Sequence, residues 1–161
     1  MKKITKLLVV SAILTMLFAV PVMAREVSFS STNTDYLITL LEANNAKLDA
    51  GLAEFVKVQC GPNKDAIIAN QTALVESAKA KVNKECAENH IGYLTKKYNL
   101  AVEYQGYRKA QLDWFTMLNT WSTTWSGKLA IAQAEYDSAV AITAADLAAL
   151  ESAKVKLAPY L

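Results

Sequence analysis

The sequence predicts an all-α fold, arranged as an elongated up-and-down helical bundle or antiparallel coiled coil. Residues 25–161 contain 23 alanines and only two prolines, Pro62 and Pro159. This balance favours long helices, because alanine loses no side-chain entropy in a helix and proline breaks one. Apolar residues also recur at alternating spacings of four and three, the pattern of helices that bury one side.

The first 24 residues are typical of a bacterial signal peptide. Two lysines give the segment a basic start, residues 7–20 are apolar and uncharged, and Val22 and Ala24 occupy the positions that signal peptidase reads. We expect cleavage after Ala24 and export to the periplasm or the exterior. The alternative is a retained membrane anchor, although the uncharged stretch is shorter than the roughly 20 residues that cross a bilayer.

Length and charge exclude several classes of protein. A chain of 161 residues fits a single domain. Its 17 basic and 15 acidic residues give a net charge of +2, and cleavage would remove three lysines and no acid, leaving 14 against 15, or −1. A charge so close to neutral excludes a strongly cationic nucleic-acid binder. A hydrophobic content of 53% excludes a highly charged, disordered chain.

The helical domain is expected to cover residues 34–158, between a flexible lead at residues 25–33 and a short tail at residues 159–161. Thr34 or Asp35 is the expected N-cap of the first helix. Its apolar seam comprises Leu37, Leu41, Asn44, Leu48, Gly51, Phe55 and Val58.

A stronger apolar stripe follows in the middle of the chain, and a second row beside it broadens the apolar side. The stripe comprises Tyr93, Leu100, Tyr104, Tyr107, Trp114, Leu118, Trp121 and Trp125, and the row beside it comprises Leu94, Tyr98, Ala101, Leu112 and Phe115. Residues 119–127 are rich in Ser and Thr and end in glycine, which predicts a turn. A last helix is expected from there until the chain reaches Pro159.

The two cysteines, Cys60 and Cys86, lead to two alternative architectures. Export to an oxidising compartment favours an intrachain disulfide between them. Such a bridge requires the chain to reverse near residues 70–72, which gives three long arms at about residues 34–70, 73–118 and 127–158. The alternative is four helices that turn at Gly61–Pro62 and near residues 89–92 and keep the two thiols far apart.

Candidate catalytic, metal and cofactor residues are few, and we expect no enzyme activity, no metal and no cofactor. Cys86 and His90 are four residues apart on an expected helix, but zinc requires further ligands. His90 and Met117 could serve as axial haem ligands, yet no Cys-x-x-Cys-His motif accompanies them. His90 is the only histidine, and no Gly-x-Ser-x-Gly motif indicates a hydrolase.

The aromatic residues of the stripe form the candidate interaction surface. Two interpretations remain open: the rings fill the core of the bundle, or they form an exposed platform that binds a protein, a sugar or a membrane interface. The residues in question are Tyr104, Tyr107, Trp114, Trp121 and Trp125.

We therefore expect an exported, non-enzymatic helical protein that acts as a scaffold or adaptor, binding another protein or a second copy of itself. The alternative function is a carrier that holds a small apolar ligand or a sugar among its aromatic rings. Residues 64–112 have a net charge of +3, from eight basic and five acidic residues. This basic strip suggests contact with anionic envelope polymers or lipid headgroups, unless its charges only solvate helix faces.

Overall fold

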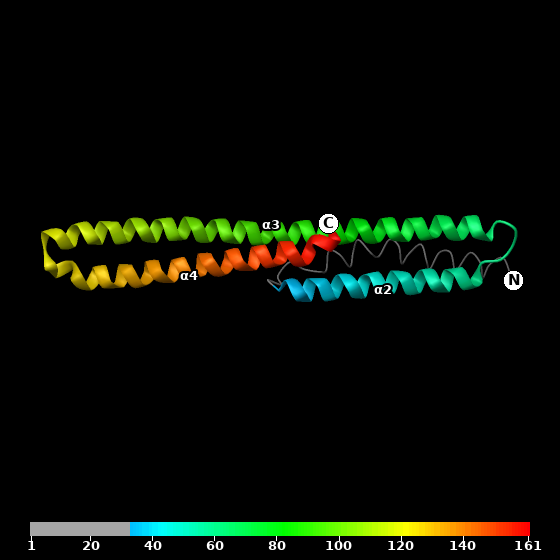
Figure 1. Ribbon diagram of the computed structural model, residues 1–161, viewed down its shortest axis with the longest axis horizontal. Helices are drawn as coiled ribbons and strands as arrows, with labels where there is room; N and C mark the ends of the chain where they lie inside the picture. The colour runs from blue at the N-terminus through cyan, green and yellow to red at the C-terminus, as the bar shows by residue number, and fades with distance from the viewer. Residues whose placement is uncertain (1–32) are drawn as a thin grey trace, which may run out of the picture. The chain divides into compact units, whose positions relative to one another are not determined.

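The structure, a computed structural model, describes residues 33–161, and over these residues the all-α prediction is confirmed. The described part contains three α-helices, two short 3-10 helices and no strand. The predicted signal peptide and nearly all of the predicted lead lie outside it. Figure 1 labels the three α-helices. In chain order the elements are α2 (Thr34–Val58), α3 (Lys64–Trp121), η1 (Thr123–Trp125), α4 (Ser126–Leu157) and η2 (Ala158–Tyr160).

Helix α2 begins one or two residues earlier than the N-cap expected from the sequence would place it. Its N-cap is Asn33, neither Thr34 nor Asp35, because the Asn33 side-chain oxygen accepts hydrogen bonds from the backbone N–H groups of Asp35 and Tyr36 at 3.0 and 3.3 Å. The inward side of α2 agrees with the predicted seam. Its buried residues are Leu37, Leu41 and Phe55.

The chain leaves α2 through a turn at residues 59–63. Gln59 has an extended backbone, and Gly61 has a φ of +101°, a conformation that residues with a Cβ rarely adopt. Pro62 has no N–H to donate to a continuing helix. The backbone N–H of Lys64 donates to the Gly61 carbonyl at 3.3 Å, and α3 begins there.

Helix α3 is continuous at both places where the sequence suggested a further reversal. Residues 70–72, the turn of the three-arm arrangement, and residues 89–92, a turn of the four-helix arrangement, are helical. Gly92 costs a helix only about 1 kcal/mol relative to alanine. His90 and Leu94 on either side of it are buried four residues apart, so packing outweighs this cost. The predicted boundary at residues 70–72 is therefore wrong, because the chain has already turned at Gly61.

The second turn lies where the sequence placed it. Ser122 has an extended backbone and its side-chain oxygen accepts a hydrogen bond from the Thr124 N–H, which starts η1. Helix α4 then begins at Ser126 and ends at Leu157, within one residue of each predicted boundary. No helix among the described residues is long and apolar enough to cross a membrane.

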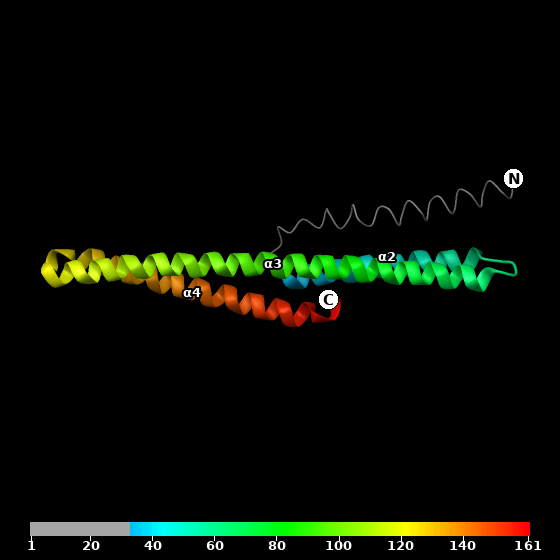
Figure 2. The same ribbon diagram turned by 90° about the horizontal axis from the view of Figure 1, so that it is seen from above.

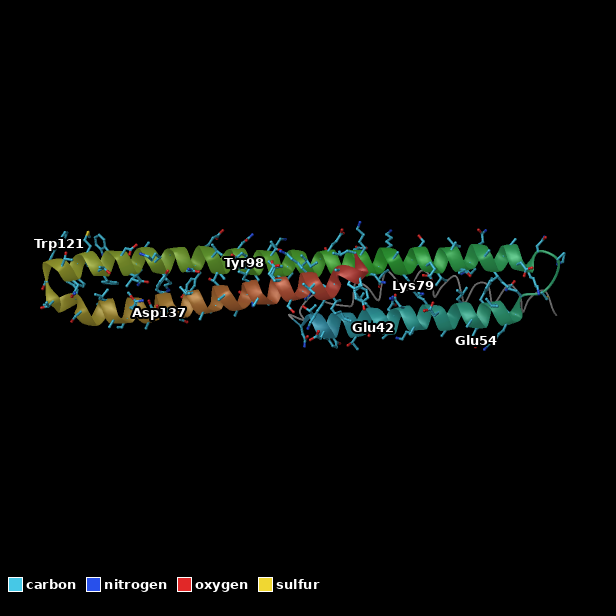
Figure 3. All side chains as sticks on the ribbon, viewed as in Figure 1. Glu42, Glu54, Lys79, Tyr98, Trp121 and Asp137 are labelled. Carbon is cyan, nitrogen blue, oxygen red and sulfur yellow. The ribbon has the colours of Figure 1, made fainter. Side chains whose placement is uncertain are left out.

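The chain forms two compact units. Of the described residues, the first unit contains 33–90 together with Leu157–Leu161. Within it α2 runs antiparallel to the first part of α3, since Asp49 pairs with Lys79 at 2.5 Å and Thr34 with His90 at 3.1 Å. Lys79 is labelled on α3 in Figure 3.

The second unit, residues 91–156, is an antiparallel pair formed by the later part of α3 and by α4. These two segments lie side by side in Figures 1 and 2. Lys97 pairs with Asp146 at 2.6 Å, and the Thr143 hydroxyl donates to the Ala101 carbonyl at 3.2 Å. We refer to this unit as the α3–α4 hairpin.

The predicted disulfide is not present: Cys60 and Cys86 are both free, the first exposed and the second buried. Cys60 lies in the turn before α3, whereas Cys86 lies 22 residues after Lys64 within that helix. The helical rise over 22 residues is about 33 Å, and a disulfide needs α-carbons within about 7 Å. The bridge required the mid-arm reversal that α3 does not make. Burial raises the pKa of the Cys86 thiol.

Candidate interaction surface

The α3–α4 hairpin buries the second row of α3, the one that lies beside the stronger apolar stripe in the sequence. On α3 this row includes Leu94, Ala101 and Leu112, all buried. Opposite it, α4 contributes small buried residues, among them Ala132 and Ala139. Small side chains allow helix backbones to approach closely, and in this hairpin the buried residues of α3 come from this one row.

The strong stripe of α3 is therefore exposed. Its members recur at spacings of seven, four and three residues and keep between 38% and 74% of their side-chain surface in solvent. The exposed row and the buried row of α3 are offset by one residue, which corresponds to about 100° around the helix. We call this set the exposed stripe: Tyr93, Leu100, Tyr104, Tyr107, Trp114 and Trp121.

All five predicted interaction residues lie in the second unit, and none of them is buried, as filling the core would require. Tyr104, Tyr107, Trp114 and Trp121 project from α3, and Trp121, at its C-terminal end, is the most exposed of them (Figure 3). Trp125, in η1, is less exposed and contacts the Phe115 ring at a centroid distance of 6.1 Å. It thus closes the end of the hairpin more than it extends the platform.

Arg108 organises the middle of the stripe, and sequence reasoning missed it. Its guanidinium lies 4.9 Å from the Tyr104 ring centroid and 5.5 Å from that of Tyr107. It also donates to the Tyr104 hydroxyl at 2.8 Å and to Glu135 of α4 at 2.8 Å. Cation–π contacts and the ion pair hold both rings in place. The spacing of four residues between Tyr104 and Arg108 was the available signal.

The exposed stripe adjoins one side of α4. Lys97 falls in the register of the stripe, four residues after Tyr93, and its partner on α4 is Asp146. Ile142 lies one helical turn before Asp146 and is about half exposed. Ile131 lies eleven residues before Ile142, which is about three helical turns. It is therefore on the same side of α4, and it is also exposed. Sequence reasoning missed both isoleucines, because a pattern along the last helix alone does not show which of its sides adjoins α3.

This segment of α4 has little charge to keep it in water. Residues 138–150 contain one charged residue, Asp146, which is buried and paired with Lys97. Val140, Ile142 and Leu147 are nevertheless exposed. A helix that is apolar on several sides is usually covered by other structure.

The basic strip at residues 64–112 is largely neutralised. Five of its eight cations form ion pairs within the chain. Lys79, for example, pairs with Asp49 and Glu76, and its hydrogen bond to Asp49 contributes most to raising its pKa. This pairing supports solvated helix faces more than a surface for anionic polymers. The paired cations are Lys79, Lys84, Lys97, Arg108 and Lys109.

His90 and Cys86, the pair considered for metal binding, are both buried on α3. The Nε2 atom of His90 is hydrogen-bonded to the Thr34 hydroxyl at 3.1 Å, which joins the start of α2 to α3. Over residues 33–161, no group of three or more His, Cys, Asp or Glu side chains gathers where a metal could bind. Burial lowers the pKa of His90 below its ordinary value of 6.5.

The lowered pKa of His90 predicts that acid weakens the fold. Below pH 6.5 the unfolded chain takes up a proton that the folded chain resists, so stability is complete above this pH and falls below it. The loss is at most about 1.4 kcal/mol per pH unit. Urea unfolding at about pH 7.5 and pH 5.5, above the range where carboxylates titrate, measures it. A His90→Gln variant should lack this loss, and an equal loss in both proteins would contradict the prediction.

No protein-family model, curated protein or solved structure compared with the chain matches it. The fold and the surface by themselves place it in the class of all-helical proteins, with an exposed aromatic stripe on its second unit.

Proposed function

We propose that the chain is an exported, non-enzymatic helical protein that acts by binding another protein, as a scaffold or adaptor of the bacterial envelope or exterior. One observation carries this proposal: the strongest apolar stripe of the sequence lies on the outside of the α3–α4 hairpin. The place of action rests on the predicted signal peptide.

The size and composition of the stripe support a binding role. An aromatic side chain can bury roughly 150–250 Å². Multiplied by this area, the exposed fractions of the five aromatic residues of the exposed stripe give about 500 Å² of surface. Leu100, Ile131 and Ile142 raise this area to about 700 Å². The largest apolar patch of an ordinary monomer covers about 300–600 Å². Trp, Tyr and Arg, which dominate here, are also the residues most enriched at interface hot spots.

The same stripe suggests how the fold is completed. Each unit holds one antiparallel helix pair, and a pair buries only one seam of each helix. A partner helix packed along the exposed stripe would add the missing layer and give a bundle or coiled coil, the architecture expected from the sequence. The bound form, in this proposal, is the complete bundle.

Protein binding accounts for the stripe better than a ligand carrier does. A small-molecule site is concave and encloses about 70–90% of its ligand. The rings here lie in a row along one side of α3, and consecutive members such as Tyr107, Trp114 and Trp121 are seven residues apart. Seven residues rise about 10 Å along a helix, so one small ligand would contact few of these rings.

Affinity capture from the exported fraction of the native host tests the proposal. The tagged chain should retain a protein in stoichiometric amount, and a variant with both Trp114→Ala and Trp121→Ala should lose it, since truncating a hot-spot ring weakens binding by about thirtyfold. Val155→Ala, which truncates a highly exposed side chain of α4 outside the stripe, is the control and should retain the protein.

Three results of these experiments would contradict the proposal or replace it. If the double variant retained the captured protein as well as the wild type does, the stripe would not be the binding surface. A chain that stays monomeric and retains no protein would contradict the proposal. A co-purified small molecule found by native mass spectrometry, and lost in the double variant, would replace it with the carrier function.

A further inference from the structure

We propose that the partner of the exposed stripe is a second copy of this chain. Two α3–α4 hairpins would pack stripe against stripe and form a four-helix bundle. This inference rests on the function proposed above and names its partner.

The spacing of the exposed stripe indicates that the segment packed against it is a helix. Successive apolar members at intervals of seven, four and three residues form the seam of a coiled coil, whose knobs fit between residues of a facing helix. The seam against α4 is already filled by the neighbouring row that contains Leu94 and Ala101. The exposed stripe is thus a second seam on α3, with no helix of the second unit left to fill it.

The area fits a dimer of this chain. Each hairpin offers about 700 Å², and a standard interface takes about 800 Å² from each partner. Two copies would bury about 1,400 Å² in total, within the range of about 1,200–2,000 Å² for stable, specific complexes.

The charge distribution permits self-association. A two-fold interface brings the same patch of both copies together, so unpaired charges of one sign would repel across it. The six members of the exposed stripe are uncharged. Lys97, which falls in the register of the stripe, and Arg108, which contacts two of its rings, are paired within the chain with Asp146 and Glu135. The facing stretch of α4 at residues 138–150 adds no further charge.

The stripe also has a centre suited to a two-fold axis. Tyr107 lies fourteen residues from both Tyr93 and Trp121. In an antiparallel pairing about Tyr107, Leu100 meets Trp114 of the second copy, and Tyr93 meets its Trp121. Large indoles thereby face smaller side chains, which favours close packing at the interface.

Sedimentation velocity of the full exported chain over a dilution series tests the inference. The wild type should sediment as a dimer that dissociates on dilution. Tyr107→Glu should weaken the dimer by at least about thirtyfold, since it removes a central ring and places two like charges at the axis. Tyr36→Glu is the matched control: this tyrosine of α2 is 54% exposed, against 62% for Tyr107. It should leave the dimer unchanged.

A mixing experiment separates self-association from a failure to fold. Tyr107→Glu and Tyr107→Lys should each be monomeric with a wild-type helical dichroism spectrum. Mixed in equal amounts, they should form a heterodimer, because the opposite charges now meet at the axis. A wild type that stays monomeric at every concentration would overturn the inference, and so would equal dimerisation of the Tyr107→Glu and Tyr36→Glu variants.

The outcomes also separate this inference from the proposed function. A monomeric chain that captures a different protein through Trp114 and Trp121 would overturn the second-copy partner and leave the proposed function in place. Stripe-dependent binding of the monomer to phosphatidylglycerol–phosphatidylethanolamine vesicles, with no captured protein, would overturn both and indicate a membrane surface.

Discussion

Replacing Leu94 with alanine is expected to lower the free energy of unfolding by about 2–5 kcal/mol. Leu94 is 3% exposed and belongs to the row of α3 that packs against α4 in the hairpin. Its truncation removes the transfer free energy of the buried side chain and leaves a cavity that the neighbouring helix cannot fill completely. Urea unfolding followed by far-ultraviolet dichroism measures the change.

The control is the same substitution six residues along the same helix. Leu100 is 65% exposed, so Leu100→Ala should change the stability of the monomer by less than about 0.5 kcal/mol. Both substitutions are made in the Tyr107→Glu background, so that any dimer contact of Leu100 does not contribute. If Leu100→Ala cost as much as Leu94→Ala, the stripe would belong to the core and the interaction surface proposed here would be lost.

Replacing Asn89 with proline is expected to cost about 3 kcal/mol or more. Asn89 is exposed, yet it lies in the interior of α3, where its backbone N–H donates to the preceding helical turn. Proline removes this hydrogen bond, and its ring clashes with the carbonyl four residues earlier. The loss is measured as a shift of the urea unfolding midpoint.

Asn89→Ala is the control for the proline substitution. It should change stability by no more than about 0.5–0.7 kcal/mol, in the stabilising direction, because alanine is the better helix former. A proline cost below about 1 kcal/mol would indicate a turn at residues 89–92, the feature of the four-helix alternative, in place of a continuous α3.

The stability of the buried row of α3 bears on function, because the exposed stripe is a second row on the same helix. The exposure of Tyr107 or Trp114 is meaningful only if another row of α3 supplies the contact with α4. Arg108 connects the two, since it contacts the Tyr104 and Tyr107 rings on the outer side and pairs with Glu135 across the hairpin. The exposed stripe is thereby held by the same helix pair that forms the fold of the second unit.

Part of the candidate site was predictable and part was not. The five aromatic residues stood out because they recur at heptad spacing in a chain otherwise rich in alanine. Ile131, Ile142 and the pairing of Arg108 with Glu135 were not found, because they depend on which side of α4 faces α3. Interhelical pairs such as Lys97 with Asp146 determine that side, and a pattern along one helix does not contain this information.

The sequence by itself determined the helical class and the turn near Ser122, because helix propensity, glycine and capping residues act over a few neighbours. The choice between a reversal at residues 70–72 and a turn at Gly61–Pro62, both of which the sequence allowed, came from the tertiary structure. Only the tertiary structure decided which of the two neighbouring rows of α3 is buried. It also decided that Cys60 and Cys86 lie far apart. Periodicity shows that a helix has an apolar side, but which row is covered depends on the helices available to cover it and on the side that they present.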